Sequence, residues 1–209
     1  MTEVTPIRIL CVDDHPLFRE GIATLVKYQP DMTLVATAST AKQAFEQFRE
    51  HRPDVTLMDL RLPDMSGIEA ISMIRAEFPL ARFIVLTSFD GDVEVQRALA
   101  AGAHGYLLKS APLEELVEVI QKVSTGKKHV CRDMAAKVAQ HLGDDPITAR
   151  EIEVLRLIAE GNRNQDVAKR LAISEETVKV HVKHIMSKLG AQDRTQAVAI
   201  GLRRGIIHL

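Results

Sequence analysis

The sequence predicts an α/β protein whose doubly wound parallel sheet of five strands is followed by a small all-α domain of four helices. Short apolar runs alternate five times with helical patterns between residues 7 and 126, whereas only helical patterns follow residue 146. The charge also changes along the chain. Residues 1–125 carry 12 Lys+Arg and 18 Asp+Glu, a net of −6, and residues 146–209 carry 11 and 7, a net of +4. Such an asymmetry suggests two domains with different partners.

The composition is ordinary for a globular protein, with 46% hydrophobic and 26% charged residues among 209. No apolar run approaches the roughly 20 residues that span a bilayer. Residues 1–6 show no basic region followed by an apolar core, so we expect no secretory signal. Cys11 and Cys131 match no metal spacing. We expect Cys11 in the core, Cys131 as an inert surface thiol, and a cytoplasmic location.

In the first domain, each apolar run is followed by a turn or by a helix-capping residue. Pro16 suits the first turn of a helix, and Ser39 or Thr40 can cap the next one. The expected strands span 7–12, 32–38, 55–58, 82–87 and 105–109. The expected helices span 16–27, 39–50, 66–78, 93–101 and 112–126. Because crossovers between parallel strands are right-handed, we expect helices on both faces and the strand order 2-1-3-4-5.

Five polar side chains end these strands: Asp13, Asp14, Asp59, Thr87 and Lys109. Taken alone, Asp59 is better explained as a cap of the following loop, because acids commonly cap turns and helix starts. Clustered carboxylates, however, repel one another unless a cation lies between them, and oxygen ligands suit Mg²⁺. A carboxylate can also attack phosphorus, and a lysine and a threonine can hold phosphoryl oxygens. The five residues therefore predict phosphoryl chemistry at one edge of the sheet.

Residues 7–125 resemble the receiver domain of two-component response regulators. The matching stretches are Cys-Val-Asp-Asp-His-Pro, Met-Asp-Leu-Arg-Leu-Pro-Asp-Met-Ser-Gly, Val-Leu-Thr-Ser and Ala-Gly-Ala-His-Gly-Tyr-Leu-Leu-Lys. The resemblance implies that Asp59 accepts phosphate from a sensor histidine kinase. It also implies that Asp14, Asp59 and the backbone carbonyl of Arg61 bind Mg²⁺, with Asp13 acting through water.

By the same resemblance, Lys109 pairs with the phosphoryl group, Thr87 swings to bond it, and Tyr106 rotates inward to fill the vacated space. Each residue also has a simpler interpretation. Tyr106 can be a half-buried strand aromatic, Thr87 a β-branched core residue, and Lys109 a solvated strand end.

A linker is expected between the two domains, over residues 126–145. Gly126 ends the preceding helix, apolar spacing predicts a short helix over 134–142, and Gly143 to Pro146 break the chain. The predicted domains therefore span 1–125 and 146–209.

The second domain carries the pattern of a helix-turn-helix. Thr148 and Glu151 form a capping box for a first helix that ends at Gly161. Helices over 164–171 and 175–189 then flank a turn, with Ser174 as the second cap. A last helix is expected over 194–204.

The helix over 175–189 has two distinct faces. Its expected buried face consists of Val178, Val182, Ile185 and Leu189. Its outer face consists of Thr177, Lys179, Val180, Lys183 and Ser187. Lysines and an exposed valine suit the major groove of DNA, although a solvated surface explains them too. Arg163, Lys169 and Lys188 are candidates for phosphate contacts.

Residues 146–207 resemble the LuxR-type helix-turn-helix, through stretches such as Glu176-Thr-Val-Lys-Val-His-Val-Lys-His-Ile-Met-Ser-Lys-Leu-Gly190. A receiver followed by this module is the NarL/FixJ class of response regulator. The resemblance implies that Lys179, Val180 and Lys183 meet the bases and that the last helix pairs two subunits.

We therefore expect a phosphorylation-controlled transcription regulator, not an enzyme, that binds a double-stranded operator as a homodimer. A phosphatase of the haloacid dehalogenase type is one alternative, but it needs a second acid where Arg61 stands. A flavin carrier is another, but the acids after the first strand would repel the FMN phosphate. A DNA-binding protein that ignores phosphate is the third.

Overall fold

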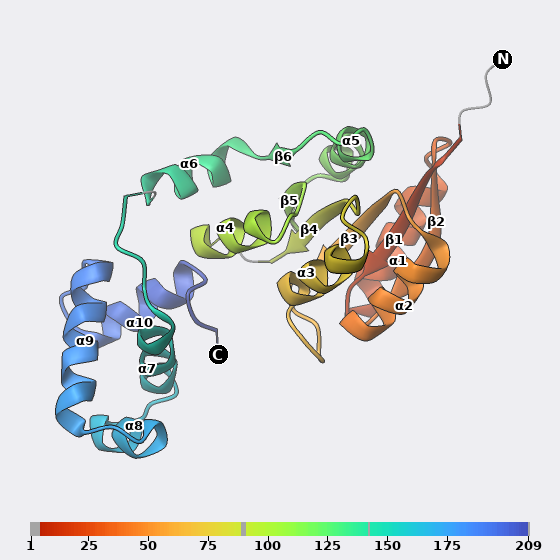
Figure 1. Cartoon of the computed structure of the whole chain (residues 1–209). Coiled ribbons are helices and arrows are strands. Elements are labelled where there is room, and N and C mark those ends of the chain that lie inside the picture. Colours follow the sequence, from red (N-terminus) through yellow and green to blue (C-terminus); the bar gives the residue numbers. More distant parts are fainter. Residues whose placement is uncertain (1–4, 89–90, 142, 209) are drawn as a thin grey trace. The chain divides into compact units, whose positions relative to one another are not determined.

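The structure, a computed structural model, describes residues 5–88, 91–141 and 143–208 (Figure 1). The expectations for residues 1–4 and for the linker helix at Leu142 lie outside these ranges. The chain divides into two compact units, formed by residues 1–89 with 95–135 and by residues 90–94 with 136–209. The boundaries expected at residues 125 and 146 stay predictions.

The first unit is built on a parallel sheet. Its strands are β1 (Ile7–Val12), β2 (Met32–Ala38), β3 (Val55–Asp59), β4 (Phe83–Thr87), β5 (Gly105–Leu108) and β6 (His129–Val130). Their order is β2-β1-β3-β4-β5-β6, and every pairing is parallel. The doubly wound class and the order of the first five strands are confirmed.

The predicted strand count was wrong, because β6 adds a sixth strand beside β5. Its pairing is short, with Gly105 opposite His129 and Tyr106 opposite Val130. Two residues preceded by Lys127 and Lys128 carry no apolar alternation that a sequence reading can detect. The strand forms because the sheet already offers the free edge of β5 as a template.

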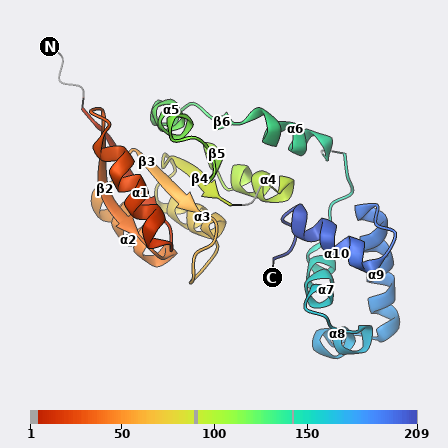
Figure 2. The same ribbon diagram turned by 180° about the vertical axis from the view of Figure 1, so that it is seen from behind.

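Helices cover both faces of the sheet, as right-handed crossovers require. The helices that follow the strands are α1 (Pro16–Lys27), α2 (Ala41–His51), α3 (Gly67–Glu77), α4 (Asp92–Ala100) and α5 (Leu113–Ser124). α1 and α5 share one core with the strands. α2 and α3 lie over the opposite face, so α1 is in front in Figure 2 and α2 in front in Figure 1. There Phe48 of α2 stacks on Phe83 of β4 with ring centroids 6.2 Å apart.

The turn after β3 is held in place by two contacts that the sequence reading did not identify. A Cβ built on Gly67 would clash with the backbone carbonyl of Asp59, so the close approach of α3 to the end of β3 requires glycine. Within the turn, the Asp64 carboxylate accepts hydrogen bonds from Ala41 N–H and Lys42 N–H, both 2.9 Å long. Asp64 thereby caps α2 and ties the loop beside Asp59 to a second helix.

The second unit is helical. It includes α7 (Ala149–Ala159), α8 (Asn164–Leu171), α9 (Glu175–Leu189) and α10 (Arg194–Arg203). A further helix, α6 (Arg132–Gln140), precedes them in the chain, and the structure ends it two residues before the predicted position. No helix in the described parts of the chain is long and apolar enough to cross a membrane.

The helix-turn-helix follows the predicted pattern closely. Ala172 ends α8 in the left-handed conformation, with φ of 54°, and the Ser174 side chain caps α9 by accepting a hydrogen bond from Thr177 N–H. On α9, Val178, Ile185 and Leu189 are buried in the core of the unit, and Val182 packs against that core. The predicted inner face of α9 is therefore confirmed. The residues predicted for its outer face are all exposed: Thr177, Lys179, Val180, Lys183 and Ser187.

The capping box of α7 is joined to α9 by an ion pair. Glu151 Oε2 lies 2.8 Å from Thr148 N and 2.9 Å from Lys188 Nζ. Burial by itself raises the pKa of Glu151, but hydrogen bonds from Thr148 and Lys188 outweigh it and lower the pKa below its ordinary 4.5. A lowered folded-state pKa gives stability that is present above the unfolded-state pKa and lost as pH falls through the folded-state pKa.

We expect Glu151→Ala to lower the free energy of unfolding of the second unit by about 2 kcal/mol, because it removes a cap and leaves the Lys188 ammonium with fewer partners. The loss should shrink as pH falls from 4.5 toward the lower folded-state pKa of Glu151, because the wild-type carboxylate then becomes protonated as well. Urea unfolding followed by helical circular dichroism measures both effects. Glu153→Ala is the matched control, because Glu153 is exposed and, among the described residues, its ion pair is with Arg150 at the surface. Equal stability of the two variants would contradict a structural role for Glu151.

Candidate functional site

The polar strand ends meet at the carboxyl edge of the sheet. Asp13 follows β1, Asp59 ends β3, Thr87 ends β4 and Lys109 follows β5. The backbone N–H of Lys109 donates to the Thr87 carbonyl over 2.8 Å, so the ends of β4 and β5 are held in register. The predicted convergence of these four residues therefore holds in the structure.

Lys109 bridges two buried acids. Its Nζ lies 2.6 Å from Asp13 Oδ2 and 2.7 Å from Asp59 Oδ2, and it also lies 4.8 Å from the ring centroid of Phe18. Asp13 is 1% exposed and Asp59 is 3% exposed. A buried carboxylate needs such a partner, because an isolated charge in the interior costs several kcal/mol. Lys109 is thus part of the site and not a solvated strand end.

Burial and pairing act in opposite directions on these groups. Burial raises the pKa of Asp59, and the hydrogen bond from Lys109 offsets only part of this effect. Burial also lowers the pKa of Lys109, but hydrogen bonds to Asp13 and Asp59 outweigh it, so the pKa is raised overall. Lys109 therefore stays charged and supports the charged form of Asp59 where burial alone would disfavour it.

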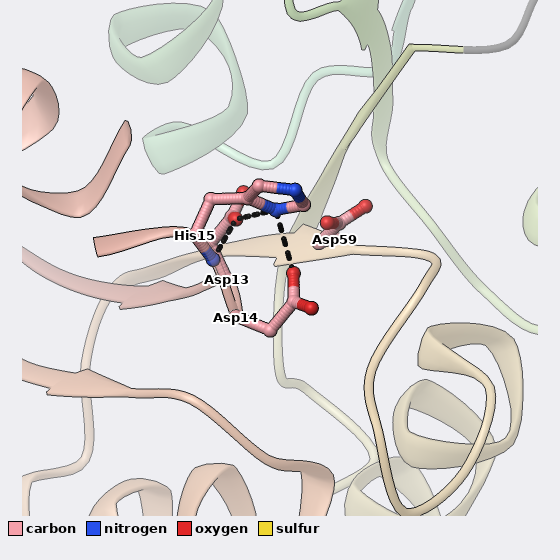
Figure 3. Close-up of side chains that lie close together, drawn as sticks. All are labelled: Asp13, Asp14, His15 and Asp59. Carbon is pink, nitrogen blue, oxygen red and sulfur yellow. Dashed lines mark hydrogen bonds and ion pairs between the residues drawn. The ribbon is translucent and has the colours of Figure 1, made fainter. Parts of the chain in front are cut away.

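A cluster of possible metal ligands lies beside this bridge (Figure 3). Each of Asp13, Asp14, His15 and Asp59 offers one ligand atom, and these atoms all lie within 4.8 Å of one another. Asp13 Oδ2 is buried and lies beside the Lys109 ammonium. Three carboxylates this close together, two of them buried, fit a hard divalent cation.

Three further predicted residues lie in or shortly after β3, β4 and β5. The backbone N–H of Arg61 is 3.3 Å from Asp59 Oδ1. Thr87 is buried at the end of β4, and Tyr106 is fully buried in β5, opposite Val85. Tyr106 is therefore more deeply buried than the half-buried aromatic of the simpler interpretation.

Two neighbours of Asp13 were missed as site residues. The Arg19 guanidinium donates to the Asp13 carbonyl over 2.6 Å and holds the end of β1. His15 was not among the predicted site residues, yet its Nδ1 lies 2.7 Å from Asp14 Oδ1 and 3.2 Å from Asp13 Oδ1. A histidine directly after two acids at a strand end was the signal that could have indicated this cluster.

A cavity of about 420 Å³ opens beside the Lys109 side chain. Its walls are formed by His15, Leu17, Phe18, Ser88 and Lys109. The site is therefore accessible from one side to a small molecule or to a side chain of another protein.

The predicted DNA-binding residues lie mainly on exposed positions of the second unit. Thr177, Lys179, Val180 and Lys183 are exposed on α9, and 47% of Val180 is accessible, which is high for a large apolar residue. Lys179 forms a surface ion pair with Glu176, 3.1 Å long.

The three residues predicted to contact DNA phosphates differ in their exposure. Arg163, the N-cap residue of α8, and Lys169 are both exposed. Lys188 is different, because its side chain is only 16% exposed and its ammonium also donates to the Pro146 carbonyl over 3.0 Å. This geometry favours a structural role for Lys188 over the predicted phosphate contact.

Comparison with known proteins places both units in described families. Residues 9–121 match the model of the response regulator receiver domain. Residues 145–200 match the model of the bacterial regulatory proteins of the luxR family.

Full-length relatives share this arrangement. The uncharacterized transcriptional regulatory protein YxjL of Bacillus subtilis is 40% identical, over 97% of this chain and 98% of its own. The response regulator protein VraR of Staphylococcus aureus is 37% identical, over 97% of this chain and 99% of its own. A solved structure of RcsB from Salmonella enterica serovar Typhimurium, bound to a promoter in the presence of phosphomimetic BeF₃⁻, is 25% identical with a TM-score of 0.72. The match covers 94% of this chain and 98% of that one.

The two family models are those of a response regulator receiver and of bacterial regulatory proteins, and the two relatives are named as a transcriptional regulatory protein and a response regulator. These are classes of regulators and not of enzymes. This chain belongs to the two-component response regulators in which a receiver domain precedes a LuxR-type helix-turn-helix.

Proposed function

We propose that Asp59 accepts a phosphoryl group from a sensor histidine kinase and that this modification controls operator binding by α9. The observation that carries the proposal is the bridge of Lys109 between Asp13 and Asp59 at the carboxyl edge of the sheet. This arrangement holds a carboxylate nucleophile beside a fixed positive charge in a chain that also carries a DNA-binding module.

The transfer itself needs few groups. A carboxylate oxygen of Asp59 attacks phosphorus and forms an acyl phosphate, while the bond from phosphorus to the donor histidine breaks and its electrons return to the imidazole. Lys109 Nζ, 2.7 Å from Asp59 Oδ2, is placed to pair with an incoming phosphoryl oxygen. Asp14, Asp59 and the Arg61 carbonyl would hold Mg²⁺, with Asp13 acting through water. When bound, this ion neutralises the charge shared by the carboxylates and the phosphoryl oxygens.

Thr87 and Tyr106 would relay the change. In this proposal the Thr87 hydroxyl bonds the phosphoryl group, and the Tyr106 ring occupies the space that Thr87 vacates. Both side chains are buried on adjacent strands, which supports a coupled movement. The Tyr106 ring is fully buried in this structure.

DNA would be read by the outer face of α9 lying in the major groove. Lys183 is exposed, and no acidic side chain within residues 5–88, 91–141 and 143–208 forms an ion pair with it, so its ammonium is available. Lys179 would join it at the bases, Thr177 would lie beside them, and Val180 would touch a thymine methyl group. Arg163 and Lys169 would contact phosphates.

Dimerisation would supply the gain in affinity. Two copies paired through α10 place two recognition helices on two half-sites, and linked half-sites bind far more tightly than one. The solved RcsB structure on a promoter with BeF₃⁻ supports this link between a phosphoryl mimic and DNA.

We expect BeF₃⁻ with Mg²⁺ to shift the wild-type chain from monomer to dimer, because the mimic completes the site around Asp59. Multi-angle light scattering measures the mass directly. Asp59→Asn should show no shift under the same conditions. A shift of equal size in that variant would contradict control through Asp59.

A further inference from the structure

We propose that His15 is a ligand of the cation site and that it makes the site prefer a divalent transition ion such as Mn²⁺ or Co²⁺ over Mg²⁺. The inference rests on the proposed function, because the same carboxylates form the site. It adds a nitrogen to a set of ligands that otherwise consists of oxygen atoms.

The imidazole is directed at the acids. Figure 3 shows the ring of His15 turned toward the carboxylates of Asp13 and Asp14, with Asp59 approaching from the neighbouring strand. Nδ1 lies 2.7 Å from Asp14 Oδ1 and 3.2 Å from Asp13 Oδ1. A cation placed among these oxygen atoms would therefore also be within reach of Nδ1.

Neither helix capping nor core packing explains this orientation. His15 is the N-cap residue of α1, but its side chain makes no capping hydrogen bond. The side chain is 69% exposed, so it contributes little to the core. Its backbone N–H separately donates to Asp13 Oδ1 over 2.9 Å. Among the described residues, the hydrogen bonds and ion pairs of the ring are those with Asp13 and Asp14.

The choice of ion follows from ligand chemistry. Carboxylate and carbonyl oxygens suit Mg²⁺, whereas imidazole suits first-row transition ions, whose affinity for nitrogen rises from Mn²⁺ toward Co²⁺ and beyond. In a neutral imidazole the proton can reside on Nε2, which leaves the lone pair of Nδ1 for the cation. Because Asp13 is buried and Pro16 fixes the start of α1, the ligand atoms are held close together before any ion arrives.

The test uses the full-length chain and two ions, Co²⁺ and Mg²⁺, titrated separately by calorimetry. His15→Asn keeps an amide that can donate to Asp14 but removes the imidazole. We expect this variant to bind Co²⁺ at least about tenfold more weakly while its Mg²⁺ affinity is unchanged. His184→Asn is the matched control, because His184 is exposed on α9, outside the cluster, and it should leave both affinities unchanged.

Pulsed electron paramagnetic resonance of bound Mn²⁺ reports the ligand atom itself. A coupling to ¹⁴N in the wild type that disappears in His15→Asn supports the inference. A wild-type signal without this coupling, or a coupling that survives in His15→Asn, overturns it. In either of those cases an intact BeF₃⁻ response shows that the proposed function stands. Absence of binding of every divalent ion by the wild type would instead contradict the cation site and both proposals.

Discussion

Asp59→Asn is expected to abolish phosphoryl acceptance from a small phosphodonor such as acetyl phosphate. The amide has the shape of the carboxylate but lacks its nucleophilic oxygen, so labelling should fall to less than about a thousandth of the wild-type rate. The fold should persist, because Lys109 keeps Asp13 as a partner at 2.6 Å. Mass spectrometry of the intact chain measures the added group.

The matched control for this prediction is Asp54→Asn. Asp54 precedes the other end of β3, where it is exposed and accepts a hydrogen bond from Arg8 N–H. This variant should be labelled as fast as the wild type. Labelling of Asp59→Asn at the wild-type rate would show that the phosphoryl group goes elsewhere.

Lys183→Ala is expected to weaken operator binding by at least about tenfold, which corresponds to one base or phosphate contact of 1–3 kcal/mol. Lys183 is exposed on α9, one turn from Lys179 and beside Val180, so its loss removes charge from the proposed interface without disturbing the core. Fluorescence anisotropy with a selected duplex measures the affinity at several salt concentrations.

Lys42→Ala serves as the control for Lys183→Ala, because Lys42 is an exposed lysine on α2 of the other unit. The two variants change net charge equally. If both weakened DNA binding to the same extent, the effect of Lys183 would be general electrostatics, and the assignment of α9 as the recognition helix would fail.

Local signals in the sequence predicted most of the fold. β2, α8 and α9 begin and end at the predicted residues, because each is bounded by a cap, a turn or a change in apolar spacing. β6 has no such signal, since its two residues form a strand only because the edge of β5 is available. Local sequence patterns therefore predicted the helices and strands whose own residues carry capping, turn or periodicity signals. They did not predict β6, which forms only through its pairing with β5.

In the candidate site, too, some features could be predicted from the sequence and others depend on tertiary contacts. Strand ends in a parallel sheet must meet at one edge, so the grouping of Asp13, Asp59 and Lys109 followed from order alone. The bridge of Lys109 between two acids depends on side-chain geometry, and so does the approach of His15 to Asp14. Likewise Lys188, which has the pattern of an exposed basic residue, is bound by Glu151 through the packing of α7 against α9.

The most direct test of phosphorylation-controlled DNA binding compares the affinity of the full-length chain for one duplex with and without acetyl phosphate and Mg²⁺. The duplex is selected from a random library by the treated wild-type protein. We predict that treatment raises the affinity of the wild type at least about tenfold, through dimerisation on two half-sites, and leaves Asp59→Asn unchanged. Equal affinities of treated and untreated wild type, with phosphorylation of Asp59 verified by mass, would contradict the account.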